Sequence, residues 1–468
     1  MPDRPNILWI CTDQQRYDTI GALGNPHVHT PNLDRLAAEG VAFTHAFCQS
    51  PICTPSRASF LTGMYPSTVH ACTNGNEVWA GAAPLISRLL ADAGYDTGLA
   101  GKLHLAGAQG RIEPRGDDGY RVFEWSHHPE NNWPAGHAYA DWLRGRGYDP
   151  DLVKASPEAL PVELHQSIWC AERAIAFIEQ AGDRPWLMSV NPFDPHAPFD
   201  PPAEILAHYD PAALPGPLFQ ESDLASQARL SDVDFQNPAR RPEEFDAKRI
   251  QAAYYAMIEL LDMAVGRMMQ VVERLGQRER TIVIFTSDHG EMLGDHGLLL
   301  KGCRFYEGLV RVPLLISWPG RFQAGLVSDA LVELTDLAPT LLHACGLPMP
   351  ERVQGRSLLP ILTGQAEPHV HRDFVRCEYY RALNPDAPGR QGLFEGTYAT
   401  MFRDQRYKLV VYHGHPLGEL FDLQADPGEF DNLWNDPAHA AVRFDLLKRS
   451  FDALAFAVDI GPKQVAYY

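Results

Sequence analysis

The sequence predicts an α/β protein with a large mixed, mostly parallel sheet between layers of helices. Short apolar runs alternate with segments whose apolar residues recur at helical spacing, as in chains built from strand–helix units. Polar residues directly follow several of these runs, and open α/β sheets bind their ligands at such strand ends. A length of 468 residues exceeds what one core usually serves, so we expect a large domain and a smaller one.

The large domain is expected to hold most of the regular elements. Strands are predicted where short, mostly apolar runs occur, at residues 7–11, 97–100, 186–190, 281–286 and 312–317. Helices are predicted at residues 33–39, 85–93 and 252–275, and Gly94 and Gly276 end the last two. Residues 106–146 are rich in Gly, Pro, His and Trp, and residues 205–248 are acidic and proline-rich. We interpret both as long connections of the kind that form lids or binding loops.

The pattern changes after about residue 370. Residues 398–412 alternate like two paired strands, residues 419–423 predict another strand, and residues 440–456 predict a terminal helix. We therefore expect a large domain over residues 1–370. Residues 371–468 are expected to form an α+β subdomain with a small antiparallel sheet and a terminal helix.

The charge balance is strongly acidic, with 40 Lys and Arg residues against 59 Asp and Glu residues and a net charge of −19. Such a chain is not expected to bind nucleic acid or an anionic membrane surface. An anionic substrate would need a locally positive pocket to overcome this field.

Targeting segments and membrane spans are not evident in the sequence. The N-terminus lacks the features of a signal peptide, and no apolar run reaches the roughly 18 residues of a membrane span. Eight cysteines are scattered without a C-x-x-C pair, which predicts neither a zinc site nor a dense disulfide framework. These features favour a cytoplasmic protein with reduced thiols.

The most informative stretch is residues 53–63, Cys-Thr-Pro-Ser-Arg-Ala-Ser-Phe-Leu-Thr-Gly. A proline that can open a helix follows the thiol of Cys53, and free N–H groups at a helix start can bind an anion. Arg57 stands one turn further on. The string resembles the signature of the sulfatase family, C-x-P-S-R-x-x-x-L-T-G, at every fixed position. The resemblance implies the fold of alkaline phosphatase, and oxidation of Cys53 to formylglycine by a formylglycine-generating enzyme.

Four further residues suggest a metal site. Asp13 and Gln14 follow the first strand, and Asp288 and His289 follow the strand at 281–286. Their oxygen-rich set suits Ca²⁺, and the imidazole would also suit Mn²⁺. The resemblance implies one such ion at these positions, with modified Cys53 as a further ligand. The family often has Asp at the position of Gln14 and Asn at that of His289, so Mn²⁺ and Mg²⁺ stay open beside Ca²⁺.

The resemblance also assigns roles in hydrolysis of a sulfate ester. One hydroxyl of the hydrated aldehyde attacks sulfur and displaces the alcohol, and loss of a proton from the second hydroxyl releases sulfate. Arg57 is implied to stabilise the ionised diol, Lys102 to bind the sulfate oxygens and His104 to take the proton. His196 and Lys301 are implied to hold the leaving-group oxygen, with His196 as general acid.

Three functions remain open at this point. We favour an arylsulfatase-like enzyme with side activity on phosphonates and phosphate diesters. The alternative is a phosphonate monoester hydrolase or phosphodiesterase of the same superfamily, which tends to carry Tyr and Thr in place of Lys102 and His104. A non-catalytic metal- or oxyanion-binding protein with unmodified Cys53 is the third.

Substrate and assembly are less well determined. We expect a small sulfate ester as substrate, and a homo-oligomer. The apolar tail at residues 465–468 could pack on a partner subunit. Five aromatic residues could line a substrate pocket or simply pack their loop: Trp125, His127, His128, Trp133 and His137. Asn74 and Asn76 are further candidates for contacting the anion.

Overall fold

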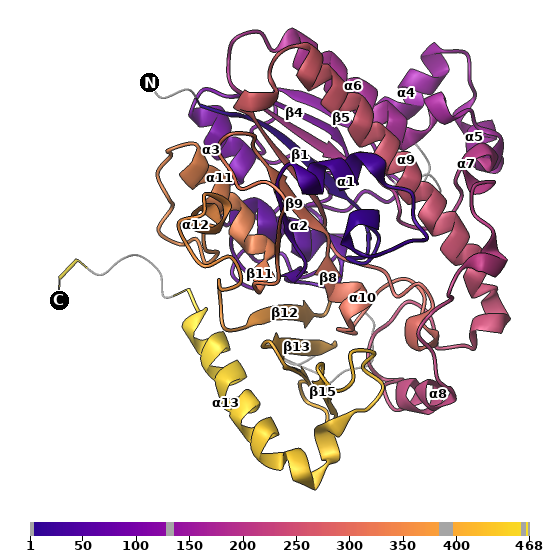
Figure 1. Ribbon diagram of the computed structural model, residues 1–468, viewed down its shortest axis with the longest axis vertical. Helices are drawn as coiled ribbons and strands as arrows, with labels where there is room; N and C mark the ends of the chain where they lie inside the picture. The colour runs from indigo at the N-terminus through magenta and orange to yellow at the C-terminus, as the bar shows by residue number, and fades with distance from the viewer. Residues whose placement is uncertain (1–3, 128–134, 383–395, 460–464, 467–468) are drawn as a thin grey trace.

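The computed structural model describes residues 4–127, 135–382, 396–459 and 465–466 (Figure 1). An eight-stranded sheet forms its centre, in the order β10-β2-β9-β7-β1-β6-β4-β5. Every neighbouring pair is parallel except those of β9, which runs antiparallel to β2 and β7. The strands are β1 (Asn6–Thr12), β2 (Val41–Phe43), β4 (Asp96–Gly101), β5 (Val122–Trp125), β6 (Trp186–Asn191), β7 (Thr281–Ser287), β9 (Leu314–Ser317) and β10 (Leu326–Ser328). The predicted fold class is confirmed.

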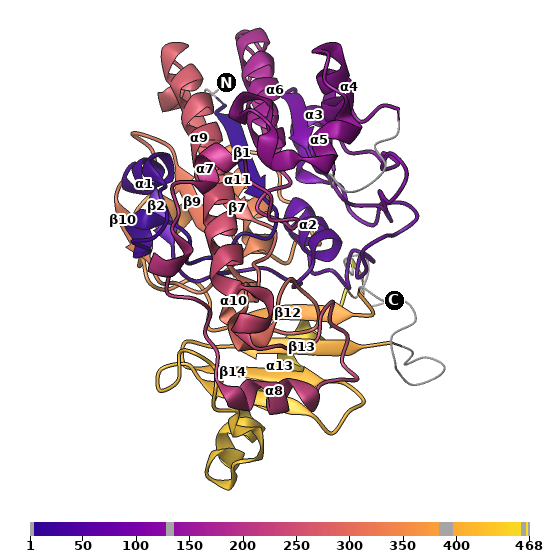
Figure 2. The same ribbon diagram turned by 90° about the vertical axis from the view of Figure 1, so that its right-hand side faces the viewer.

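Helices cover both faces of this sheet (Figures 1 and 2). One face carries α1 (Pro31–Ala38), α6 (Gln166–Gln180) and α9 (Ala247–Arg274), and the other carries α2 (Cys53–Thr62), α3 (Ile86–Asp92) and α11 (Leu337–Ala344). Successive side chains of a strand point to opposite faces. Accordingly Ile7 and Trp9 of β1 join the core beneath α2, whereas Leu8 and Ile10 join the core beneath α9.

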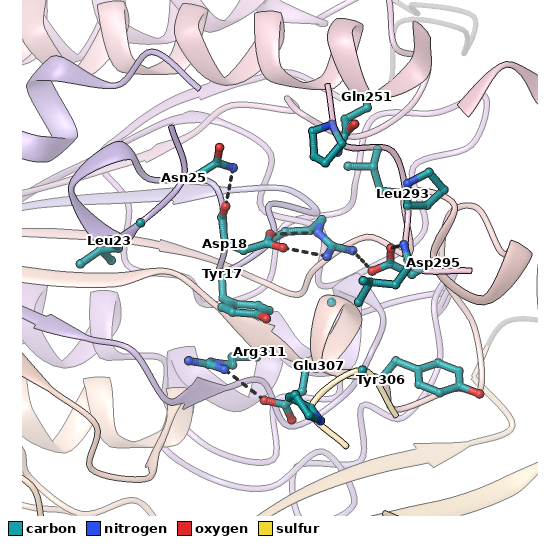
Figure 3. Close-up of a pocket in the computed structure, with 18 of the residues that line it drawn as sticks. Tyr17, Asp18, Leu23, Asn25, Gln251, Leu293, Asp295, Tyr306, Glu307 and Arg311 are labelled. Atoms are coloured by element: carbon teal, nitrogen blue, oxygen red, sulfur yellow. Dashed lines mark hydrogen bonds and ion pairs between the residues drawn. The ribbon is translucent and has the colours of Figure 1, made fainter. Parts of the chain in front are cut away.

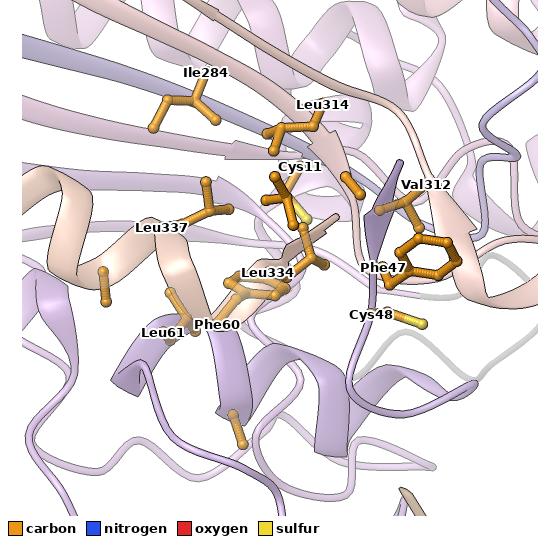
Figure 4. Packing of buried hydrophobic residues seen from close by; sticks show 14 of the residues in the cluster. Cys11, Phe47, Cys48, Phe60, Leu61, Ile284, Val312, Leu314, Leu334 and Leu337 are labelled. Atoms are coloured by element: carbon orange, nitrogen blue, oxygen red, sulfur yellow. The ribbon is translucent and has the colours of Figure 1, made fainter. Parts of the chain in front are cut away.

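The core beneath α2 fixes the position of that helix. Phe60 and Leu61 pack among Leu334, Leu337 and Cys11, as Figure 4 shows. The ring of Phe60 lies 5.6 Å from that of Trp9 in β1. Every residue of α2 is buried, and its first residue, Cys53, lies 3.7 Å from the carboxylate of Asp13 at the end of β1.

Two smaller sheets complete the structure. A three-stranded sheet contains β11 (Val332–Glu333), β3 (Ala46–Phe47) and β8 (Arg311–Val312). The antiparallel C-terminal sheet contains β12 (Val375–Tyr380), β13 (Tyr398–Arg403), β14 (Tyr407–Tyr412) and β15 (Gly418–Asp422), with α13 (Ala440–Phe456) packed against it. The predicted small sheet and terminal helix are present, while the domain boundary at residue 370 stays a prediction.

Some predicted elements were wrong. The strand expected at 312–317 is divided between β8 and β9, which belong to different sheets, because Pro313 between them has no N–H to donate to a ladder. The two presumed long connections hold β5 and the helices α4 (Ala138–Gly145), α7 (Ala203–Leu206) and α8 (Glu221–Ala228). The remaining short helices are α5 (Pro150–Ala155), α10 (Glu307–Val310) and α12 (Leu359–Leu362). Within the described ranges, no helix is long and apolar enough to cross a membrane.

Candidate active site

The candidate site lies where four parallel strands end and α2 begins. Backbone hydrogen bonds tie these ends together. Asp13 N donates to Asp194 O at 3.1 Å, and Lys102 N donates to Asn191 O at 2.8 Å. Asp288 N donates to Thr12 O at 3.2 Å. The residues that follow β1, β4, β6 and β7 therefore share one edge of the sheet, as open α/β architecture requires.

Cys53 is the first residue of α2 and is buried at the centre of the cluster. Its Sγ lies 3.0 Å from Lys301 Nζ, 3.2 Å from His289 Nε2 and 3.7 Å from Asp13 Oδ1. Burial and the Asp13 carboxylate raise the pKa of this thiol, but the nearby positive groups outweigh them and lower it to about 5. The position thus favours a negatively charged nucleophile.

Two buried carboxylates face the cations of the site. Arg57 Nε donates to Asp288 Oδ2 at 2.8 Å, and Arg57 Nη2 lies 3.4 Å from Asp13 Oδ2. Lys102 Nζ pairs with the same Asp13 oxygen. Burial raises the pKa of Asp13, but Lys102 together with His196 and Lys301 holds it well below its usual range. The Asp13 carboxylate is therefore ionised at neutral pH.

Lys301 reaches this cluster from a loop remote in sequence. Its Nζ donates to Gln14 Oε1 at 2.7 Å, besides its contact with Cys53, and the side chain is buried. Gln14 Nε2 in turn donates to Glu291, a buried carboxylate that the sequence analysis missed. Glu291 also accepts from the backbone N–H of Leu293 at 3.0 Å, so it holds the loop that leads to Lys301.

The ligand set fits a divalent cation. Asp13, Cys53, Asp288 and His289 each offer one ligand atom, and these atoms all lie within 4.8 Å of one another. His289 Nδ1 donates to Gly290 O at 2.8 Å, because a carbonyl can only accept. That bond leaves Nε2 facing the cluster, an arrangement typical of metal-binding histidines. The Oε1 atom of Gln14 lies beside them, in contact with the Lys301 ammonium.

His104 follows Lys102 on the loop after β4. Its backbone has a positive φ of 58°, which is unusual for a residue with a side chain. Burial, Lys102 and Arg57 lower the pKa of its imidazole well below the ordinary value, so the ring is neutral at neutral pH. Among the residues that the structure describes, Nδ1 of this buried ring has no hydrogen-bond partner.

Glu113 holds that loop, and sequence reasoning missed it. Its buried carboxylate accepts from three successive backbone N–H groups, those of His104 at 2.8 Å, Leu105, and Ala106 at 3.0 Å. It also accepts from Trp125 Nε1 at 3.1 Å. The sequence does not single it out, because Arg111, Arg115, Asp117 and Asp118 stand in the same segment.

His196 sits on the loop after β6. Its ring lies 4.5 Å from that of Phe193, and its Nδ1 lies 2.6 Å from Ala197 O. The side chain is half-buried, and its charge contributes to the lowered pKa of Asp13. His196 therefore borders the same cluster, from the loop whose Asp194 carbonyl accepts the Asp13 N–H.

The side chains that the sequence suggested as further substrate contacts mainly hold neighbouring segments of the chain in place. Asn74 Oδ1 accepts from Thr54 N at 2.9 Å, in the first turn of α2, and Asn76 Oδ1 accepts from Thr73 Oγ1. Trp125 is anchored to Glu113, and His137 caps α4. The ring of His127 lies 4.7 Å from that of His104. His128 and Trp133 lie outside the described residues.

A cavity of about 410 Å³ lies apart from this cluster, and none of the predicted site residues is among those described as lining it. Arg16 pairs with both Asp18 and Asp295, and its Nη1 lies 2.8 Å from Asp295 Oδ2. Figure 3 shows these two carboxylates in the cavity wall. Arg311 and Glu307 form a further pair across 3.4 Å. Because these charges are matched within the protein, the pairing explains their presence without a ligand.

Two family models match this chain. The family model described as Sulfatase matches residues 5–347, and that of the C-terminal region of N-sulphoglucosamine sulphohydrolase matches residues 294–455. The chain belongs to the sulfatase family. The predicted family and the assignment as a sulfuric ester hydrolase are confirmed at this level.

Individual relatives agree with this family. An arylsulfatase of Clostridium perfringens is 30% identical, over 95% of this chain and 93% of that protein. A choline-sulfatase of Rhizobium meliloti is 31% identical, over 93% and 83% respectively. The crystal structure of a phosphonate monoester hydrolase of Agrobacterium radiobacter matches with a TM-score of 0.83 and 28% identity, over 97% of this chain and 96% of that one. The sulfatase fold found here is therefore alkaline-phosphatase-like, as predicted.

Proposed function

We propose that this sulfatase hydrolyses small sulfate monoesters through a formylglycine hydrate at position 53, beside a divalent cation. The observation that carries the proposal is the position of Cys53 Sγ, within 3.0–3.7 Å of Lys301, His289 and Asp13 at a buried helix start. A cytoplasmic location, maturation by a formylglycine-generating enzyme and a homo-oligomeric state stay predictions.

The cation would be held by Asp13, Gln14, Asp288 and His289, with modified residue 53. When bound, it supplies Lewis-acid stabilisation of negative charge. Dialysis against a chelator should abolish activity, and separate addition of Ca²⁺, Mn²⁺ and Mg²⁺ should identify the ion that restores it. Full activity in protein shown by elemental analysis to be metal-free would contradict this assignment.

The hydrated aldehyde supplies one hydroxyl as nucleophile and a second whose deprotonation releases the product. The protein's own residues position and balance this chemistry. Arg57 Nη1 donates to Lys102 O at 3.0 Å, which links the cation of α2 to the loop that bears Lys102. Lys102 and Lys301 supply the local positive charge that an anionic substrate needs in a chain of net charge −19.

Proton transfer is assigned to the two histidines. His104 is neutral, buried and has a free Nδ1 within the described structure, so it can accept a proton from the nucleophile. His196 is half-buried at the border of the cluster, a position suited to protonating the departing oxygen. The two roles differ because the ring of His104 is buried, whereas that of His196 is half-buried.

A phosphonate monoester or phosphodiester hydrolase is the second candidate. The 28% identity and TM-score of 0.83 to the Agrobacterium radiobacter enzyme favour it. Lys102 and His104 favour sulfate, because a Lys–His pair at these positions is typical of sulfatases.

Initial rates on an aryl sulfate, an aryl phosphonate monoester and an aryl phosphodiester separate the two functions. We expect the highest kcat/KM on the aryl sulfate. Cys53→Ala should lose activity on all three substrates, whereas Cys72→Ala, which changes a thiol outside the cluster, should keep it. A clear preference for the phosphonate would overturn the assignment to sulfate esters.

A further inference from the structure

The terminal helix α13 exposes more aromatic surface than its own packing explains. Its inner side is complete, because Leu446 and Ala453 join the core of the C-terminal sheet. Three phenylalanines elsewhere on the helix are largely exposed: Phe444 at 75%, Phe451 at 69% and Phe456 at 86%. Figures 1 and 2 show α13 on the outside of the small sheet. Exposed aromatic clusters of this kind mark interaction surfaces.

The order of residues on this surface identifies the partner. Phe444, Lys448, Asp452 and Phe456 follow one another at intervals of four, which places them along one ridge of the helix. The side chains of Lys448 and Asp452 both reach solvent and pair with each other within the chain. Read backwards, the ridge becomes Phe, Asp, Lys, Phe. It is therefore complementary in charge and shape to a reversed copy of itself.

We propose that two copies of this chain pair through antiparallel α13 helices, about a twofold axis midway between Lys448 and Asp452. Phe444 then packs against the partner's Phe456, and Lys448 faces Asp452 of the partner subunit. Phe451 flanks the axis. A twofold interface uses the same patch on both subunits, so every contact occurs twice. The ridge between Phe444 and Phe456 is about 18 Å long, enough for two helices that cross to share all four residues.

Charge reversal tests this pairing directly. Lys448→Asp sets like charges against the partner's Asp452, and Asp452→Lys does the same with the opposite sign. Each variant alone should raise the dissociation constant of the dimer about tenfold or more. An equimolar mixture of the two should regain the dimer, because each acidic side chain of one variant then faces a basic side chain of the other. The double variant should also dimerise, since it restores both the pair within the helix and the pairs between helices.

The measurement is sedimentation velocity over a range of concentrations, with the wild type expected at twice the chain mass of 52.1 kDa. Phe451→Glu should give monomers. Helical circular dichroism and unchanged aryl-sulfatase activity show that each variant is folded, because α13 is not part of the candidate active site. A monomeric wild type, or a dimer indifferent to Phe451→Glu and both charge reversals, would overturn the proposal. So would single variants that dissociate and whose mixture stays monomeric.

Discussion

At the scale of single residues, the site concentrates positive side chains within a molecule whose net charge is negative. The carboxylates of Asp13 and Asp288 are buried among Arg57, Lys102 and Lys301, within a chain of net charge −19. Buried ions need partners, because their desolvation is costly. These cations balance the carboxylates beside the position of Cys53, so the contacts that stabilise the folded site also favour an anionic substrate.

Glu113 gives the first residue-scale prediction. Its carboxylate accepts from the N–H groups of His104, Leu105 and Ala106, and an amide in its place would set an N–H₂ group against some of these donors. Glu113→Gln should destabilise the loop by about 1–3 kcal/mol and lower kcat about tenfold or more through displacement of His104. Thermal unfolding and kcat on the aryl sulfate measure the two effects.

The matched control is Glu77→Gln, which alters an exposed carboxylate on a nearby segment. It should change neither quantity. If Glu113→Gln kept both its wild-type melting temperature and its kcat, other contacts would have to hold the loop after β4.

At the scale of elements, the close approach of two strands determines where the loop that bears Lys102 begins. Gly101 ends β4 with a φ of 110°, and a Cβ there would lie 2.0 Å from Asn191 O of β6. Only glycine tolerates both conditions. The chain can therefore leave β4 beside β6 and bring Lys102 directly into the cluster.

The junction of α1 and α9 gives an element-scale prediction. Asp262 of α9 accepts from Leu33 N at 2.7 Å and Asn32 N at 3.0 Å, so it caps α1 from outside. Burial raises the pKa of Asp262 from 3.8 to about 6, although these N–H groups oppose the shift. Folding thus favours the protonated form. The Asp262 carboxyl therefore contributes fully to the free energy of unfolding at pH values below its pKa in the unfolded chain. This contribution is lost as the pH rises through about 6.

Asp262→Asn removes this titration. Between about pH 7.5 and pH 5, the free energy of unfolding of the wild type should rise by about 1 kcal/mol relative to that of the variant. Denaturant unfolding at both pH values measures the difference, with the exposed Asp183→Asn as control. A difference between wild type and Asp262→Asn that does not depend on pH would contradict the raised pKa.

How far the sequence predicts these features depends on the range of the contacts. Asp13, Lys102 and Asp288 were predictable because each directly follows its own strand, and the polar residue and the apolar run are visible together. Glu113 and Glu291 were not, because their partners are backbone groups of loops whose path the sequence pattern leaves open. The division of residues 312–317 between two sheets was not predicted, because the apolar pattern of this run is that of a single strand. The pattern alone does not show that Pro313 interrupts the hydrogen bonding.

At the scale of the whole molecule, a buried ion network joins helix α10 to the C-terminal sheet. Glu307 of α10 lies 2.8 Å from Lys408 Nζ of β14 and 3.2 Å from Arg403 Nε of β13. Lys408 also contacts Glu429 at 2.7 Å. The chain after β12 is thus tied to the segment that follows the Lys301 loop.

Removing the central cation tests this coupling. Lys408→Met leaves Glu429 without its ion pair and weakens that of Glu307, and we expect a loss of about 3–5 kcal/mol in the free energy of unfolding. Lys248→Met, at an exposed position, should have little effect. Thermal and denaturant unfolding provide the measurement. Equal stability of the two variants would show that the network does not stabilise the contact between α10 and the C-terminal sheet.

The most direct test of the central claim is the mass of the tryptic peptide that ends at Arg57, from chain produced together with a formylglycine-generating enzyme. The account predicts a peptide lighter than its cysteine form by the mass of H₂S less one oxygen atom, in a proportion that rises with aryl-sulfatase activity. A fully active preparation in which this peptide carries only unmodified cysteine would contradict it.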